Sequence, residues 1–263
     1  MEILNIKALV IRESDYGEND KLLTLLSAEK GVFSAVVKGG KSLKNKNAAS
    51  SQLLCLSEFV LKERNGFYTL SEASLIEQFF SLRSSLYKFS LAQYVCEMCL
   101  SVGTQNEDSS SLMSLVLNTL YMLCTSDKDT DLIKAVFELR CAYISGFSPD
   151  IFSCRTCGKE NDSTFYLDVM NGNICCQSCF GTDEDTKEHV SSHLSSLIIP
   201  LEKSELECMR YVTSANPKRI FSFNAEGETC SRFCNVCEKY LLNHIERGFK
   251  TLDFYKNVKK MGL

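Results

Sequence analysis

The chain has 263 residues, of which 44% are hydrophobic and 24% are charged, and this composition excludes a disordered chain, a collagen and a coiled-coil rod. Its net charge of -4 means that an anionic partner needs a local basic patch, because the overall field does not attract it. No run approaches the roughly 20 apolar residues of a membrane helix, and no basic N-terminal segment precedes an apolar core. We therefore expect a cytoplasmic protein of several small domains, with no membrane partner.

The first 80 residues have the pattern of a small β-barrel. Apolar runs at 6–11, 21–26 and 32–37 are each bounded by turn residues, and two further runs flank Asn65-Gly66, a dipeptide typical of tight hairpins. Five short strands with one longer connection after the third predict a closed barrel. The expectation for residues 1–80 is an OB-fold, with an SH3-like barrel as the alternative.

From Leu82 onward the apolar residues recur every three or four positions, which is the spacing of helices. Gly146 and Pro149 end this helical segment. Helical periodicity returns after a cysteine-rich insert, at 202–213 and 228–247. The sequence therefore predicts an α+β multidomain protein whose helical domain is interrupted by a zinc finger. The expected segments are the barrel at 1–80, the first part of the helical domain at 81–150, the insert at 151–182 and the second helical part at 183–263.

The insert contains two pairs of cysteines with metal-ligand spacing. Cys154 and Cys157 form one C-x2-C pair, Cys176 and Cys179 form the other, and 18 residues separate the pairs. Four thiolates close a tetrahedral site for one structural Zn2+ ion, with no open position for water. Cys175 is an alternative to Cys176, which we prefer because it completes the two-residue spacing. The competing interpretation is four unrelated buried thiols.

A third cysteine group carries the alternative function. Cys230, Cys234 and Cys237 have, by spacing alone, the arrangement of the iron–sulfur site in radical S-adenosylmethionine enzymes. The same residues share one apolar helical stripe with Leu241 and Ile245, so we interpret them as core thiols. A metal- or iron–sulfur-dependent enzyme built on these three cysteines remains the second hypothesis.

Four lysines give the barrel a candidate surface for nucleic acid. Lys38, Lys41, Lys44 and Lys46 lie within nine residues on the longest connection, with no acidic residue among them. There they would stand beside the groove in which OB-folds bind single strands. A solubilising basic loop is the competing interpretation. Arg12 could extend the patch, and Phe33, Phe67 and Tyr68 are candidates for contacts to bases, although alternation along the strands places some of these aromatic residues in the core.

No catalytic set is apparent, which favours a binding role. Two of the three histidines, His189 and His193, are spaced i, i+4 as metal ligands on a helix would be, but a solvated helix is the simpler interpretation. The glycines before Lys41 lack the earlier glycine that a phosphate-binding P-loop requires, because Ala35 occupies that position.

Several stretches resemble the bacterial recombination mediator RecO family. The segments at 8–12, 16–26, 29–31 and 37–41 resemble the N-terminal barrel of that family almost element by element. The segment at 146–158 resembles its join between helical domain and zinc finger, and 247–252 resembles its closing segment. The resemblance spans nearly the whole chain.

This resemblance implies a DNA-binding protein without enzymatic activity. Members of the family bind single- and double-stranded DNA, anneal complementary strands, and work with RecR to load RecA onto strands coated by the single-stranded DNA-binding protein. Lys38 and Lys41 match the basic loop that the family uses on DNA, and Cys154, Cys157, Cys176 and Cys179 match its zinc ligands. Lys44 and Lys46 extend that loop by proximity.

Overall fold

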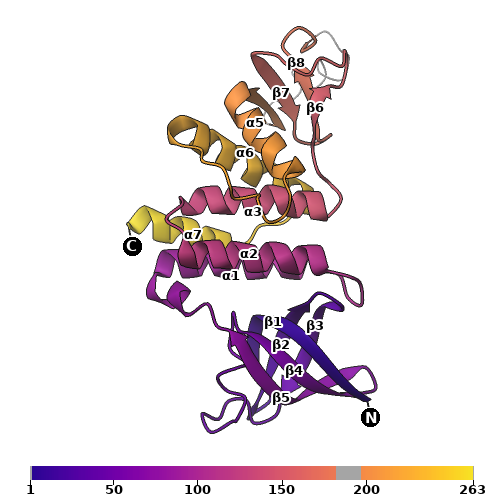
Figure 1. Ribbon diagram of the computed structural model, residues 1–263, viewed down its shortest axis with the longest axis vertical. Coiled ribbons are helices and arrows are strands. Elements are labelled where there is room, and N and C mark those ends of the chain that lie inside the picture. The colour runs from indigo at the N-terminus through magenta and orange to yellow at the C-terminus, as the bar shows by residue number, and fades with distance from the viewer. Residues whose placement is uncertain (1, 182–196, 263) are drawn as a thin grey trace. The chain divides into compact units, whose positions relative to one another are not determined.

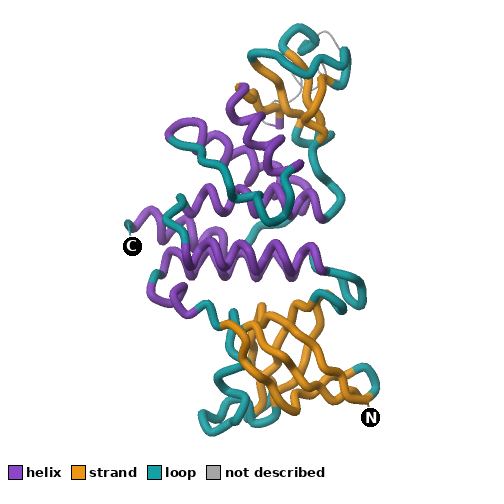
Figure 2. Tube along the Cα trace, viewed as in Figure 1, coloured by secondary structure: helices purple, strands orange, loops and turns teal. Residues whose placement is uncertain are grey.

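The computed structural model describes residues 2–181 and 197–262, which fall into two compact units. The first unit comprises Met1–Asp127 and Phe249–Leu263, and the second comprises Lys128–Gly248. Strands dominate the N-terminal part and helices follow, as Figures 1 and 2 show. The α+β class predicted from the sequence is confirmed. None of the described helices is long and apolar enough to cross a membrane.

Five strands of the first unit close into a barrel. They are β1 (Glu2–Tyr16), β2 (Asp20–Ser27), β3 (Gly31–Val37), β4 (Leu56–Arg64) and β5 (Phe67–Glu77), in the order β1-β2-β3-β5-β4. The long strand β1 pairs with both β2 and β4, and a short parallel pairing of β3 with β5 completes the closure. This strand order is that of an OB-fold, so the predicted barrel type is confirmed.

Alternation along the strands builds the interior of the barrel. One face of each strand contributes to a buried cluster, which includes Ile6, Ala8, Val10, Leu23, Leu25, Phe33, Ala35, Phe59 and Leu61. The other face of β1 and β2 is buried as well, at Leu9 and Leu26, because helices cover it. The pairing of β1 with β2 shifts register between Val10 and Arg12.

The helices of the first unit are η1 (Phe80–Ser84), α1 (Leu86–Val102), α2 (Ser110–Thr125) and α7 (Lys250–Met261). Helix α1 packs against β1, η1, α2 and α7, and α2 packs against β2. Backbone hydrogen bonds join the β2–β3 turn to the connection between α1 and α2, among them Val32 N–H to the Thr104 carbonyl at 2.9 Å. Gly31 is required there, because its φ is +62° and a Cβ would lie 2.0 Å from the Thr104 oxygen.

In its described residues, the second unit combines three helices with a small sheet. Helices α3 (Thr130–Ile144), α5 (Lys203–Ser214) and α6 (Gly227–Ile245) pack on one another. The buried ammonium of Lys134 on α3 binds Glu138 and, at 2.9 Å, Glu238 on α6, which fixes the register of those two helices. The four domain segments expected from the sequence remain a prediction, since these two units group the helices differently.

The sheet of the second unit has the order β6-β8-β7-β9. Its strands are β6 (Asp150–Cys154), β7 (Thr164–Asp168), β8 (Asn173–Cys176) and β9 (Ile198–Glu202). Strand β9 is absent from our sequence analysis, which expected helices throughout this part of the chain. It pairs antiparallel with β7, from Thr164 opposite Glu202 to Asp168 opposite Ile198, and therefore belongs to the cysteine-rich sheet.

Candidate functional site

The longest connection of the barrel, residues 38–55, is a folded loop held on β5. We call it the lysine loop. The buried Asn47 anchors it, because its side-chain oxygen accepts a hydrogen bond from Ala73 N–H at 3.0 Å. Ser50 donates its hydroxyl to the Ala73 carbonyl at 3.0 Å, and successive turns bridge Gly39 to Ala48. The backbone of the loop is therefore positioned without a ligand.

Two of the four predicted lysines form ion pairs with the acidic residues on either side of the β1–β2 turn. Lys38 Nζ lies 2.6 Å from Asp20, whose other carboxylate oxygen accepts Gly39 N–H at 2.8 Å. Hydrogen bonding to Lys38 and to Gly39 N–H lowers the pKa of Asp20 below its ordinary 3.8. Lys41 Nζ lies 3.2 Å from Asp15 and donates to the Gly17 carbonyl at 3.0 Å. These contacts tie the lysine loop to the neighbouring turn.

The other two lysines have their charges free. Lys44 and Lys46 are exposed, and their ammonium groups make no hydrogen bond or ion pair with any residue in the described ranges 2–181 and 197–262. Lys44 follows Leu43 in a turn that Asn45 N–H closes on the Ser42 carbonyl at 3.0 Å. The loop therefore presents two unneutralised cations on a fixed backbone, which is the arrangement that phosphate contacts need.

The acidic partners Asp15 and Asp20 were missed in the sequence analysis, which counted acids only within the nine-residue lysine segment. The signal that could have found them is strand register. Because β2 pairs with β3 from Lys21 opposite Val37, the turn before β2 lies beside the start of the loop after β3.

The aromatic candidates separate into core and surface. Phe33 is 6% exposed and packs its ring edge against Tyr68 at 5.5 Å between centroids, so it belongs to the barrel interior. Tyr68 is half-buried and has Lys30 over its ring. Phe67 is exposed at the start of β5. Of these three residues, only Phe67 has its side chain largely available for contact with a base.

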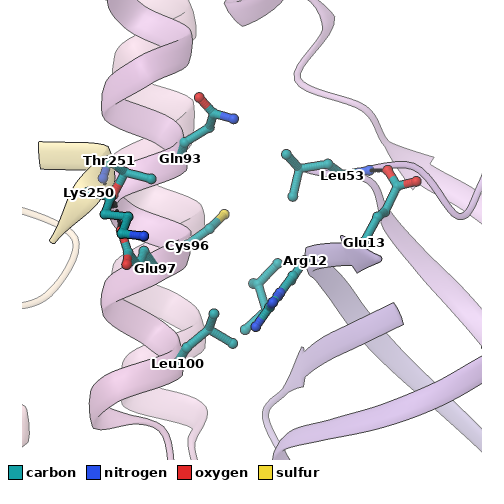
Figure 3. Close-up of a pocket in the computed structure, with 10 residues that line it drawn as sticks. Arg12, Glu13, Leu53, Gln93, Cys96, Glu97, Leu100, Lys250 and Thr251 are labelled. Atoms are coloured by element: carbon teal, nitrogen blue, oxygen red, sulfur yellow. Dashed lines mark hydrogen bonds between the residues drawn. The ribbon is translucent and has the colours of Figure 1, made fainter. Parts of the chain in front are cut away.

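Arg12 lies against the helices rather than on the lysine loop. It lines a pocket of about 370 Å³ formed by β1, Leu53, α1 and the N-terminal end of α7. Figure 3 shows Arg12 extending from the barrel toward Leu100 of α1, while Lys250 lies beside Glu97. Glu97 in the same pocket accepts Thr251 N–H at 3.1 Å and its hydroxyl at 2.5 Å. The structure thus does not group Arg12 with the ion pairs of Lys38 and Lys41.

The second unit brings the four predicted metal ligands together. Cys154 ends β6, Cys176 ends β8, and Cys157 and Cys179 lie in the turns that follow. Their sulfur atoms all lie within 4.8 Å of one another, and Cys157 Sγ is 3.7 Å from Cys176 Sγ. A tetrahedral zinc site with bonds of about 2.3 Å requires sulfurs about 3.8 Å apart. The group contains Cys176 and excludes Cys175, as the spacing argument preferred.

The electrostatics of this group also suit a cation. Burial alone would raise the pKa of Cys154. Hydrogen bonds from the backbone N–H groups of Cys176, Cys157 and Thr156 outweigh burial, and the pKa falls to about 6. Contact with the sulfurs of Cys157 and Cys176 raises the pKa of Cys179, because one thiolate opposes another. A divalent ion at the centre removes that repulsion. The group could therefore hold a metal ion, and the donor set fits zinc.

The three cysteines of the alternative enzyme hypothesis lie on α6. Cys230 and Cys237 are buried, Cys230 Sγ is 3.9 Å from Cys234 Sγ, and burial raises the pKa of all three. Within the described part of the chain, only the group of Cys154 meets the geometry of a site with three or more metal ligands. The geometry favours core thiols. His189 and His193 lie outside the described residues.

Family models and similar proteins assign this chain to the same family. The model described as recombination protein O N terminal matches residues 1–79, and the one described as recombination protein O C terminal matches residues 83–253. The DNA repair protein RecO of Acetivibrio thermocellus is 28% identical over 261 residues, which is 99% of both chains. The protein of the same name from Clostridium novyi is 31% identical over 68% of this chain and 70% of its own length. The chain therefore belongs to the recombination protein O (RecO) family of DNA repair proteins.

Proposed function

We propose that this chain is a DNA-binding recombination mediator that anneals complementary strands and, with RecR, helps to load RecA onto single-stranded DNA. It acts in the bacterial cytoplasm, on DNA of the nucleoid, and it performs no catalytic step. Its partners are single- and double-stranded DNA, RecR and the single-stranded DNA-binding protein. The observation that carries the proposal is the pair of unneutralised ammonium groups, Lys44 and Lys46, on a fixed loop of an OB-fold.

The physical step that this surface performs is phosphate neutralisation. Two complementary strands repel each other through their phosphates, and a protein that holds one strand by lysines lowers that repulsion and releases condensed counterions. Lys44 and Lys46 supply the free charge, while Lys38 and Lys41 hold the loop in position through Asp20 and Asp15. The bases of the bound strand remain available for pairing, which is what annealing requires.

The four-cysteine group has a structural role in this proposal. Cys154, Cys157, Cys176 and Cys179 would hold one zinc ion, which supplies four metal–thiolate bonds and leaves no position open for a water nucleophile. Bound there, such an ion would join the ends of β6 and β8 to the turns after them. The sheet of the second unit is then stabilised by the metal rather than by a large apolar core.

The test is fluorescence anisotropy of a labelled single-stranded oligonucleotide, titrated with the wild type and with a variant carrying Ala at Lys38, Lys41, Lys44 and Lys46. We expect salt-dependent binding by the wild type, much weaker binding by the variant, and slower annealing of complementary strands. Thermal unfolding of both proteins controls for loss of the fold. Equal binding by two equally stable proteins would contradict the assignment of the lysine loop as the DNA contact.

A further inference from the structure

A leucine stands at the tip of the lysine loop with its side chain entirely in solvent. Leu43 is 98% exposed, the highest exposure among the large hydrophobic residues that the structure describes. It occupies a central position of the turn between Ser42 and Asn45, whose amide also donates to the Lys38 carbonyl at 2.9 Å. The fold thus holds an apolar side chain away from every core, between Lys41 and the free Lys44.

An exposed aromatic residue is tied to the same loop. Tyr16 ends β1 and is 50% exposed. Lys41 Nζ contacts the residues on either side of it, the Asp15 carboxylate at 3.2 Å and the Gly17 carbonyl at 3.0 Å. Because Leu43 follows Lys41 by two positions, the ion pair that fixes the loop also brings the turn bearing Tyr16 beside it. Tyr16 and Leu43 are therefore exposed residues on two segments that Lys41 joins, and the free cations Lys44 and Lys46 belong to one of those segments.

Single-stranded nucleic acid offers two kinds of surface to such an arrangement. Its phosphates bind cations with an affinity that falls as salt rises, and its unstacked bases bind aromatic and aliphatic side chains with little dependence on salt. We propose that Tyr16 and Leu43 contact the bases of a single DNA strand whose phosphates are bound by Lys44 and Lys46. This inference rests on the proposed function and adds the base-contacting residues to it.

The arrangement favours a single strand over a duplex. In double-stranded DNA the faces of the bases are covered by stacking, so Tyr16 and Leu43 meet only the grooves or the backbone, whereas Lys44 and Lys46 still meet phosphates. Phe67 is exposed on the same barrel, but no hydrogen bond or ion pair among the described residues joins its side chain to the lysine loop, so we do not place it on the strand's path.

The experiment separates the two kinds of contact by their salt dependence. Wild type, Leu43→Ala, Tyr16→Ala and Tyr16→Phe are titrated against a single strand and against a duplex at several salt concentrations. Leu75→Ala, at another exposed leucine of the barrel (45%), is the matched control. A single strand carrying the fluorescent base 2-aminopurine reports unstacking when binding is saturated.

We expect Leu43→Ala and Tyr16→Ala to weaken single-strand binding about five- to tenfold at every salt concentration, the lower part of the range for the loss of one base contact. The salt slope and the duplex affinity remain those of the wild type. Tyr16→Phe keeps wild-type affinity because its ring is retained, and Leu75→Ala changes nothing. The 2-aminopurine signal that wild type induces falls in both alanine variants.

Three results would overturn the inference while leaving DNA binding intact: wild-type single-strand affinity in both alanine variants, equal losses on single strand and duplex, or an equal loss in Leu75→Ala. Failure of the wild type to bind either DNA at any salt concentration would instead overturn the proposed function, and the base contacts with it.

Discussion

The lysine loop brings four ammonium groups together, and the four-cysteine group brings four thiols together that repel one another when they ionise. The two regions differ in how the like charges are neutralised. The loop is supplied with its own counterions, because Asp15 and Asp20 come from the adjacent turn. Near the thiols, Lys159 pairs with Asp162 at 3.1 Å and Arg155 lies 3.9 Å from Asp168, so the charges of these two cations are directed to carboxylates. The lysine loop thus keeps spare charge for a ligand, whereas we expect the four-cysteine group to need a metal ion for its stability.

Among variants that test this difference, the largest effect is expected from removing one of the four metal ligands. We expect Cys176→Ser to release the ion and to unfold the β6-β8-β7-β9 sheet, because structural zinc contributes on the order of 10 kcal/mol in small zinc-binding domains. Metal analysis measures the release of the ion, and amide hydrogen exchange measures the unfolding of the sheet. Single-strand DNA binding by the barrel should persist.

The neighbouring cysteine provides the matched control for that variant. Cys175 is buried next to Cys176 but lies outside the four-sulfur group, so Cys175→Ser should keep one ion per chain. Retention of the metal by Cys176→Ser together with its loss from Cys175→Ser would show that the ligand has been assigned to the wrong residue.

A smaller effect is expected from releasing the lysine loop. Asn47→Ala removes the oxygen that accepts Ala73 N–H, and leaving such a group without its partner costs about 1–3 kcal/mol. Urea unfolding measures the loss, and Asn45→Ala, at a less buried position of the loop, should cost less. A variant at Asn47 as stable as the wild type would mean that the loop is not held by this contact.

The smallest effect concerns the ion pair of Lys38 and Asp20. Because the pKa of Asp20 is lowered by Lys38 and Gly39 N–H, the pair stabilises the fold above pH 3.8, and the contribution is lost as the pH falls through the lower folded value. The stability difference between wild type and Asp20→Asn should therefore shrink between pH 7 and pH 3, as measured by thermal unfolding. A difference that stays constant over this range would exclude the ion pair as its source.

The same substitution should strengthen DNA binding at neutral pH. Asp20→Asn releases the ammonium of Lys38 while its amide oxygen can still accept Gly39 N–H. Single-strand affinity at low salt should rise severalfold, with a salt slope steeper by about 0.7, the value for one added phosphate contact on a single strand. Unchanged affinity would indicate that Lys38 does not reach the DNA even when its charge is free.

Local patterns were sufficient to predict the barrel and the cysteine group. Alternating apolar residues and the Asn65-Gly66 turn identify strands from short segments, and C-x2-C spacing concerns only residues that a single turn brings together. What the sequence could not show depends on distant pairing. Strand β9 joins the sheet through β7, and Ile198 lies 30 residues after Asp168, its partner in the register.

The charges of the lysine loop show the same limit. The four lysines look equivalent in the sequence, but their positions beside the β1–β2 turn divide them into an ion-paired and a free pair. Phe33 likewise resembles a surface aromatic until its face of β3 is known, and it proves to be in the core. Tyr16, which the sequence pattern does not single out as a DNA contact, becomes a candidate only because Lys41 binds the residues on either side of it.

The division of the lysines is tested most directly by the salt dependence of single-strand binding for two double variants of equal charge. Replacing Lys44 and Lys46 by Ala should lower the slope of log affinity against log salt by about 1.4, or 0.7 for each lost phosphate contact. Replacing Lys38 and Lys41 by Ala should lower the slope by less than half of the change seen for the Lys44 and Lys46 variant. This second variant should instead reduce the stability of the barrel. Equal slopes for the two variants, or the larger loss in the Lys38 and Lys41 variant, would contradict the account.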